Sequence, residues 1–213
     1  MADDGADRGL IGLVLAIGLG DDHGASGRLA VEPALARARL GRDEEFFLPE
    51  CHAQLYEGDT ALHAAAFAYS SPLVRTLLAA GADVRARNRR GAEPLHAAVI
   101  GAPGSSNWNP TRQTAVIIEL IEAGAVPDAT ATGGVTALHR AVRNRCSAAV
   151  ETLLNAGADP HRQNDNGSTA LTLARWTTGR SGSGSPEAQR EQQIIIRLLT
   201  EDDDGSTAGR IAT

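Results

Sequence analysis

The heptapeptide TALHAAA, at Thr60–Ala66, returns in altered form three times further along the chain. Its counterparts are EPLHAAV at Glu93–Val99, TALHRAV at Thr136–Val142 and TALTLAR at Thr169–Arg175. Between the leucines of successive copies, the first and last steps are 33 residues and the middle step is 43. A fixed period of this size, broken by one insertion, predicts a stack of repeats and not a fold with a single centre.

The first copy, Gly58–Arg90, predicts a helix, a turn, a second helix and a projecting loop. Thr60 suits a helix N-cap, because its hydroxyl can accept a hydrogen bond from a free N–H of the first turn. Pro72 suits the first turn of the second helix. An Ala-Gly-Ala sequence ends that helix in the first three repeats, where a left-handed residue is favoured. The glycines concerned are Gly81, Gly124 and Gly157.

This pattern resembles the ankyrin repeat, whose period and TPLHxA signature match residues 58–167 in three consecutive copies. The resemblance implies an all-α ankyrin-repeat solenoid of stacked helix-turn-helix units with projecting, β-hairpin-like loops. Alanine replaces the usual proline at Ala61, Ala137 and Ala170, and Glu93 replaces threonine, but every helix start is kept. The residues that carry the motif, besides the three glycines, are Thr60, Leu62, His63, Leu95, His96, Thr136, Leu138 and His139.

The expected domain organisation places repeats at residues 58–90, 91–133, 134–166 and 167–200, the last being a polar terminal cap. Residues 10–57 predict a degenerate N-terminal capping repeat with an enlarged loop, and a disordered first 30 residues is the alternative. Its expected helices are Leu13–Asp21, His23–Val31 and Pro33–Leu40. We expect a flexible tail at residues 1–9 and a disordered acidic and polar tail at 201–213.

Composition and charge indicate that binding polyanions is not the main task of the repeats. All 20 basic residues of the 213 are arginine, which we interpret as a GC-rich, bacterial coding background. The net charge of −6 is concentrated in residues 1–57. The repeat body is close to neutral, which argues against general nucleic-acid binding.

Cysteine usage and the apolar segments predict a cytoplasmic protein. Cys51 and Cys146 have neither metal-type nor redox-motif spacing, which fits a reducing compartment. The apolar stretch Leu10–Leu19 follows an acidic flank, where a signal peptide needs a basic one. It is also too short to span a bilayer. We expect a monomer.

No pattern in the chain indicates catalysis, a metal or a cofactor. There is no phosphate-binding loop, no G-x-S-x-G and no HExxH. His63, His96 and His139 occupy equivalent positions of neighbouring repeats, about 8–10 Å apart, which is too far for one zinc ion. The resemblance implies that they bind neighbouring loops instead. Arginines near Cys146 would lower its pKa, but no base accompanies it, so we expect a structural thiol.

The loop Val84–Arg90 carries four arginines in six residues. In an extended strand Arg85, Arg87 and Arg89 would face one side. Arg90 completes the cluster of four. A loop with this arginine cluster would bind a carboxylate-rich protein, or alternatively a phosphate-bearing ligand or nucleic acid. A plainer interpretation is a solvent-exposed hairpin whose arginines also pair with the acidic N-terminal segment of the same chain.

Two insertions fall between the helices of their repeats, Gly101–Arg112 in the second and Gly179–Pro186 in the last. We expect both to project from the same rim. Trp108, in the first, is either a binding anchor or folds back onto the helices beneath it. The second is rich in Gly and Ser and predicts a flexible spacer.

The resemblance implies a non-catalytic module that binds a protein partner through a concave groove of loop tips and first helices. The variable helix positions are Phe67, Ile100, Arg143 and Trp176. The tip positions are Tyr56, Glu57, Asp59, Arg89, Arg90, Val135, Asp165 and Asn166. We expect Phe67 and Ile100 to lie side by side as an exposed apolar pair.

Overall fold

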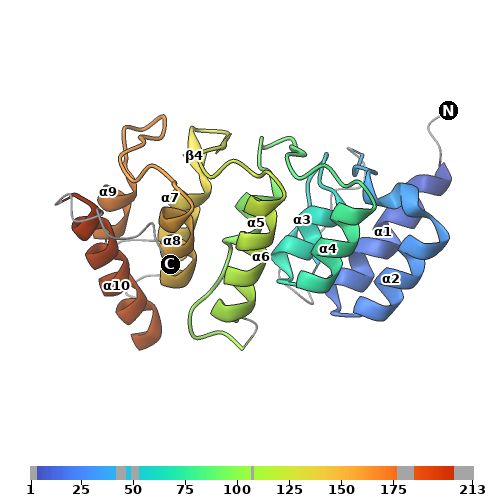
Figure 1. The fold of residues 1–213 in the computed structure, drawn as a ribbon, viewed down its shortest axis with the longest axis horizontal. Coiled ribbons are helices and arrows are strands. Elements are labelled where there is room, and N and C mark those ends of the chain that lie inside the picture. The colour runs from blue at the N-terminus through green and yellow to red at the C-terminus, as the bar shows by residue number, and fades with distance from the viewer. Residues whose placement is uncertain (1–3, 42–46, 49–52, 107, 177–184, 204–213) are drawn as a thin grey trace. The chain divides into compact units, whose positions relative to one another are not determined.

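The computed structural model describes residues 4–41, 47–48, 53–106, 108–176 and 185–203, and they are mostly helical (Figure 1). The chain divides into two compact units. The first consists of residues 1–98 with 115–126, and the second of residues 99–114 with 127–213. Each unit is described separately.

The first unit contains two stacked helix pairs and the start of a third. Its elements are α1 (Asp4–Gly18), α2 (Asp22–Val31), the 3₁₀ helix η1 (Pro33–Ala36), β1 (Phe47–Leu48), β2 (Ala53–Gln54), α3 (Ala61–Phe67), α4 (Ser71–Ala79), α5 (Pro94–Ala98) and most of α6 (Pro110–Glu122). The first helices pack in the order α1, α3, α5, and α2 packs on α4. Strands β1 and β2 pair antiparallel, with Phe47 opposite Gln54.

The second unit repeats this arrangement. Besides the first turn of α6 it holds β3 (Thr130–Ala131), β4 (Val135–Thr136), α7 (Ala137–Arg143), α8 (Ser147–Asn155), α9 (Ala170–Arg175) and α10 (Pro186–Asp203). Helix α7 packs on α9, and α8 packs on α10. The β3–β4 hairpin, with Ala131 opposite Val135, projects before α7 (Figure 1).

Repeat-equivalent leucines make the core of both units. Leu62 and Leu77 are fully buried in the first unit, and Leu138 and Leu153 are buried in the second. Three glycines end the second helices with φ between +85° and +100°, namely Gly81, Gly124 and Gly157. That conformation is strained for residues with a Cβ, which accounts for glycine at each position. The expected all-α fold of stacked helix pairs is confirmed.

The ends of the chain depart from the expected boundaries. Helix α1 begins at Asp4, so the tail expected over residues 1–9 is largely helical. Helix α2 begins one residue before the expected His23, and the expected helix Pro33–Leu40 is reduced to η1. At the other end, α10 continues to Asp203, past the expected end at residue 200.

Candidate binding surface

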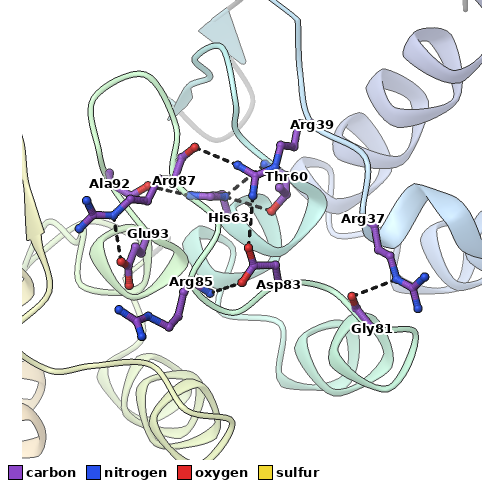
Figure 2. Close-up of polar contacts among 10 residues, drawn as sticks. All are labelled: Arg37, Arg39, Thr60, His63, Gly81, Asp83, Arg85, Arg87, Ala92 and Glu93. Carbon is purple, nitrogen blue, oxygen red and sulfur yellow. Dashed lines mark hydrogen bonds and ion pairs between the residues drawn. The ribbon is translucent and has the colours of Figure 1, made fainter.

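Two of the recurring histidines, His63 and His139, join their own repeat to the next. The Nδ1 atom of His63 accepts a hydrogen bond from the Thr60 backbone N–H at 3.1 Å, which leaves the proton on Nε2. That nitrogen lies 3.1 Å from the carbonyl oxygen of Ala92, at the start of the next repeat (Figure 2). His139 lies in the same way between Thr136 and the carbonyl of Ser168, 3.0 Å away. His96 accepts from the Glu93 backbone N–H.

These contacts give the histidines a structural task. Burial lowers the pKa of His63, although Asp59 nearby acts in the opposite direction, and burial also lowers the pKa of His139. Both rings are therefore neutral at pH 7. Among the residues that the structure describes, no group of three or more His, Cys, Asp or Glu side chains lies close enough to hold a metal ion.

Cys146 is not an activated nucleophile. Its side chain is buried, and burial raises the pKa of the thiol to about 12. Hydrogen bonds from Gln113 and Trp108, and not the arginines we expected, act to lower this pKa, and they do not outweigh the loss of solvent around the thiolate. Cys51, the other cysteine, lies outside the described residues.

The arginine loop is not an extended strand, so the alternation expected for it is wrong. Its backbone makes a turn at Val84–Arg85 and another at Arg89–Arg90, with Ala86 buried between them. The Arg85 N–H donates to the carboxylate of Asp83, while the Arg87 side chain turns toward Glu93, with Nε 3.1 Å from Oε1 (Figure 2). The four arginines therefore do not line one side.

The chain segment before the first repeat docks on this loop through arginines. Arg37 donates from Nε to the carbonyl of Gly81 at 3.2 Å (Figure 2). Arg39 donates to the carbonyl of Arg87 and pairs with Asp83 at 3.2 Å. Two arginines of the N-terminal segment thus contact the end of α4 and the loop. Nothing in the repeat pattern pointed to these two residues. Four acidic residues of that segment, Asp43, Glu44, Glu45 and Glu50, lie outside the described residues.

Tyr56, Arg89 and Arg90 form one cluster at the loop tip, which we call the Tyr-Arg cluster. The guanidinium carbons of Arg89 and Arg90 lie 5.3 and 4.5 Å from the centre of the Tyr56 ring. The Arg89 N–H donates to the carbonyl of Glu57 at 2.8 Å, which ties one loop to the other. Cations held over an aromatic face in this way gain about 0.5–1 kcal/mol at exposed sites.

Asp59 lies beneath this cluster and is buried, although it was expected as a tip residue. Its carboxylate accepts hydrogen bonds from the Tyr56 N–H at 2.8 Å and from the Asn88 side chain at 2.9 Å. Asn88 also accepts from the N–H groups of Arg90 and Ala92. The equivalent Asn164 accepts from Asn166 and Ser168. The recurrence of Asn-x-x-Gly at both places is the sequence signal for this loop anchor.

Trp108 folds back onto its own unit. It is half-buried, and its indole N–H donates to Gln113 at 3.2 Å. A Cβ atom added to Gly101 would lie 2.7 Å from both the indole ring and the Cys146 sulfur, so all three pack together. The Ser185 hydroxyl, within the second insertion, donates to the carbonyl of Pro103 at 3.4 Å. Residues 179–184 of that insertion lie outside the described residues.

The helix positions expected to contact a partner differ in exposure. Phe67 in the first unit and Ile100 in the second are both half-buried. Arg143, at the end of α7, is exposed, and Trp176, just after α9, is 65% exposed. Helix α7 packs on α9, and Arg143 and Trp176 occupy equivalent positions of the two repeats. Val135 is half-buried, and Asp165 and Asn166 are exposed.

Comparison with known proteins identifies the repeat. A family model for ankyrin repeats in many copies matches residues 120–174, and a single ankyrin repeat model matches residues 57–89. Ankyrin repeat and SOCS box protein 16 of Mus musculus is 37% identical over 130 residues, covering 60% of this chain and 28% of that protein. Its Homo sapiens counterpart is 34% identical over 129 residues, covering 61% of this chain and 28% of that protein.

A third relative, neurogenic locus notch homolog protein 1 of Danio rerio, is 34% identical over 117 residues, covering 55% of this chain and 4% of its own length. The chain thus spans less than a third of each of these relatives. The folded units define an all-α repeat protein built from stacked helix pairs. With the matching models and relatives, the chain is an ankyrin repeat protein. No helix among its described residues is long and apolar enough to cross a membrane.

Proposed function

We propose that this chain is a non-catalytic module that binds a protein partner through its loop tips and first helices. Ankyrin repeats generally serve as protein-interaction modules, and catalysis is not a general property of the family. We also propose a cytoplasmic location, because the buried thiol of Cys146 is compatible with a reducing compartment.

The Tyr-Arg cluster is the observation that carries the proposal. Tyrosine and arginine are enriched among the residues that dominate binding energy at protein interfaces. Here the ring of Tyr56 and two guanidinium groups are held together on loops whose backbone is fixed by Asp59 and Asn88. A surface that is already ordered loses little conformational entropy when a partner binds.

The second unit offers its own contact residues, Arg143 and Trp176. Trp176 exposes a large aromatic ring to solvent, and such a ring gains more from burial against a partner than other side chains do. Arg143 lies at the equivalent position of the neighbouring repeat. Asp59, Arg87 and Trp108 are left out of the proposed surface, because each is engaged within its own unit.

Affinity capture from an extract of the native host, with quantitative mass spectrometry, tests this proposal. The triple variant Tyr56→Ala, Arg89→Ala and Arg90→Ala should reduce recovery of a specific partner at least about tenfold, since each truncation of a dominant residue costs more than 1 kcal/mol. Arg197→Ala, an exposed arginine on α10, is the matched control and should leave recovery unchanged.

The same capture with Trp176→Ala and Arg143→Ala tests the second unit. If the triple variant and both of these retain every partner of the parent chain, the proposed surface is wrong.

Binding of a phosphate-bearing ligand or nucleic acid through Arg85–Arg90 is the less favoured alternative. It needs several arginines facing one ligand, whereas Arg87 is paired with Glu93 and the loop makes two turns. The two functions differ in their salt dependence, because nucleic-acid affinity falls steeply as counterions compete for the phosphates. A partner complex that persists with little change on raising the salt concentration favours the protein-binding function.

A further inference from the structure

The outer face of the first helix pair is open and apolar. On α1, the side chains of Leu10, Leu13 and Ile17 are buried, and on α2 those of Ala25 and Leu29 are buried. At 3.6 residues per turn, Leu15 falls on the opposite side of α1 and Val31 on the opposite side of α2, while Leu19 directly follows the end of α1. These three side chains are 37%, 63% and 88% exposed.

Between these two helix faces runs a groove with a volume of about 670 Å³. Its walls are the small and apolar residues of α1, α2 and η1, with three charged side chains among them. The lining residues are Gly9, Gly12, Leu15, Ala16, Leu19, Asp21, Gly24, Gly27, Arg28, Val31, Glu32 and Leu35. A Cβ atom added to Gly27 would meet no atom within 4 Å, so the surface at Gly27 is open to the backbone of another chain.

This face is less polar than the exposed surface of α10, the last helix of the second unit. On α10 most of the exposed side chains are charged or amides. They are Glu187, Gln189, Arg190, Gln193, Arg197 and Glu201. The α1–α2 face instead exposes leucine and valine, as surfaces that are covered by another chain do.

We infer that the α1–α2 face binds the same face of a second copy of this chain, in place of the monomer that we expected from the sequence. The charges on the face support a self-association. Arg28 is accompanied by Asp21 and Glu32 around the apolar centre, so a two-fold axis can bring the arginine of each copy to an acidic residue of the other.

A head-to-tail arrangement is less favourable than this symmetric one. It would set the apolar face against the charged side chains of α10, and charges buried without partners cost several kcal/mol. Because only 12 residues line the groove, against about 20–30 on each side of a standard interface, the dimer should dissociate on dilution through the micromolar range.

Sedimentation equilibrium of the full chain tests the inference. The parent should change from the monomer mass toward twice that mass as concentration rises, and both Leu19→Glu and Val31→Glu should stay monomeric. Ile118→Glu on α6 and Ile194→Glu on α10, which are also exposed, are the matched controls and should dimerise like the parent. Circular dichroism of each variant checks that it is folded.

A charge exchange tests the two-fold contact itself. Arg28→Glu alone and Glu32→Arg alone should each weaken self-association, whereas an equimolar mixture of the two variants should recover a dimer. The inference is overturned if the parent is monomeric at every concentration, if Leu19→Glu and Val31→Glu dimerise as the parent does, or if Ile194→Glu abolishes the dimer.

Discussion

The Nε2 atom of His63 lies 3.1 Å from the carbonyl oxygen of Ala92, 29 residues further along the chain. Because Nδ1 of the same ring accepts from the Thr60 N–H, the ring spans from its own helix start to the first residues of the next repeat. His139 makes the same connection to Ser168. These neutral histidines therefore join neighbouring repeats by hydrogen bonds that require one particular protonation state.

This requirement makes stability depend on pH. The pKa of His63 and that of His139 are lowered by burial below the ordinary value of 6.5. The unfolded chain then binds more protons than the folded one below pH 6.5, so stability is complete above that pH and is lost as pH falls. Urea unfolding between pH 7.5 and 5 should show a loss of up to about 1.4 kcal/mol per pH unit for each histidine.

His139→Gln isolates one of the two contributions. Glutamine retains a donor and an acceptor but does not titrate, so the variant should show a shallower pH dependence than the parent. An unchanged slope would rule out His139 as a source of the effect.

Glu93→Thr should stabilise the chain. Glu93 is buried, and its Oε2 atom has no hydrogen-bond partner among the described residues, although Oε1 is paired with Arg87. Threonine occupies the equivalent position in the other copies, as at Thr136, where it completes a capping box. Removing an incompletely paired buried carboxylate should raise the free energy of unfolding by about 1 kcal/mol or more. Thermal unfolding measures this, with Glu122→Thr at an exposed site as control.

Thiol labelling should report the packing of Trp108. In a Cys51→Ser background the only thiol is Cys146, which is buried and has a pKa of about 12, so it should react far more slowly than an exposed cysteine. Trp108→Ala should speed labelling at least about tenfold, because it removes part of the cover. Trp176→Ala is the control, since its ring is exposed. Equal rates in the parent and in Trp108→Ala would contradict the packing.

A comparison of two helix-ending glycines tests the docking of Arg37. Gly157→Ala should destabilise by about 1 kcal/mol through backbone strain alone, since no atom lies within 4 Å of the new Cβ. Gly81→Ala should cost more, because its Cβ would collide with the guanidinium of Arg37. In an Arg37→Ala background the two costs should become equal. Chemical denaturation of the two glycine variants, of Arg37→Ala and of the two double variants measures the difference. Equal costs of the two glycine substitutions in the parent chain would exclude the contact.

Much of the fold followed from short-range patterns. The helix start at Thr60, the helix-ending Gly81 and the buried Leu62 each depend on residues within one repeat, and each was predicted correctly. The conformation of Arg85–Arg90 was not, because alternation presumes a strand. Asn88 and Asp59, whose hydrogen bonds shape the loop, are brought together from positions 29 residues apart.

The sequence by itself determined the period and the helix pairs, because similar local interactions recur in successive copies and need no knowledge of the rest of the chain. Only the tertiary structure decided which irregular residues remain available to a partner. Arg87 is paired with Glu93 and Trp108 covers Gly101, whereas Arg89 and Arg90 flank Tyr56 at the loop tip. Burial and pairing depend on the folded conformation of each loop, which no periodic pattern records.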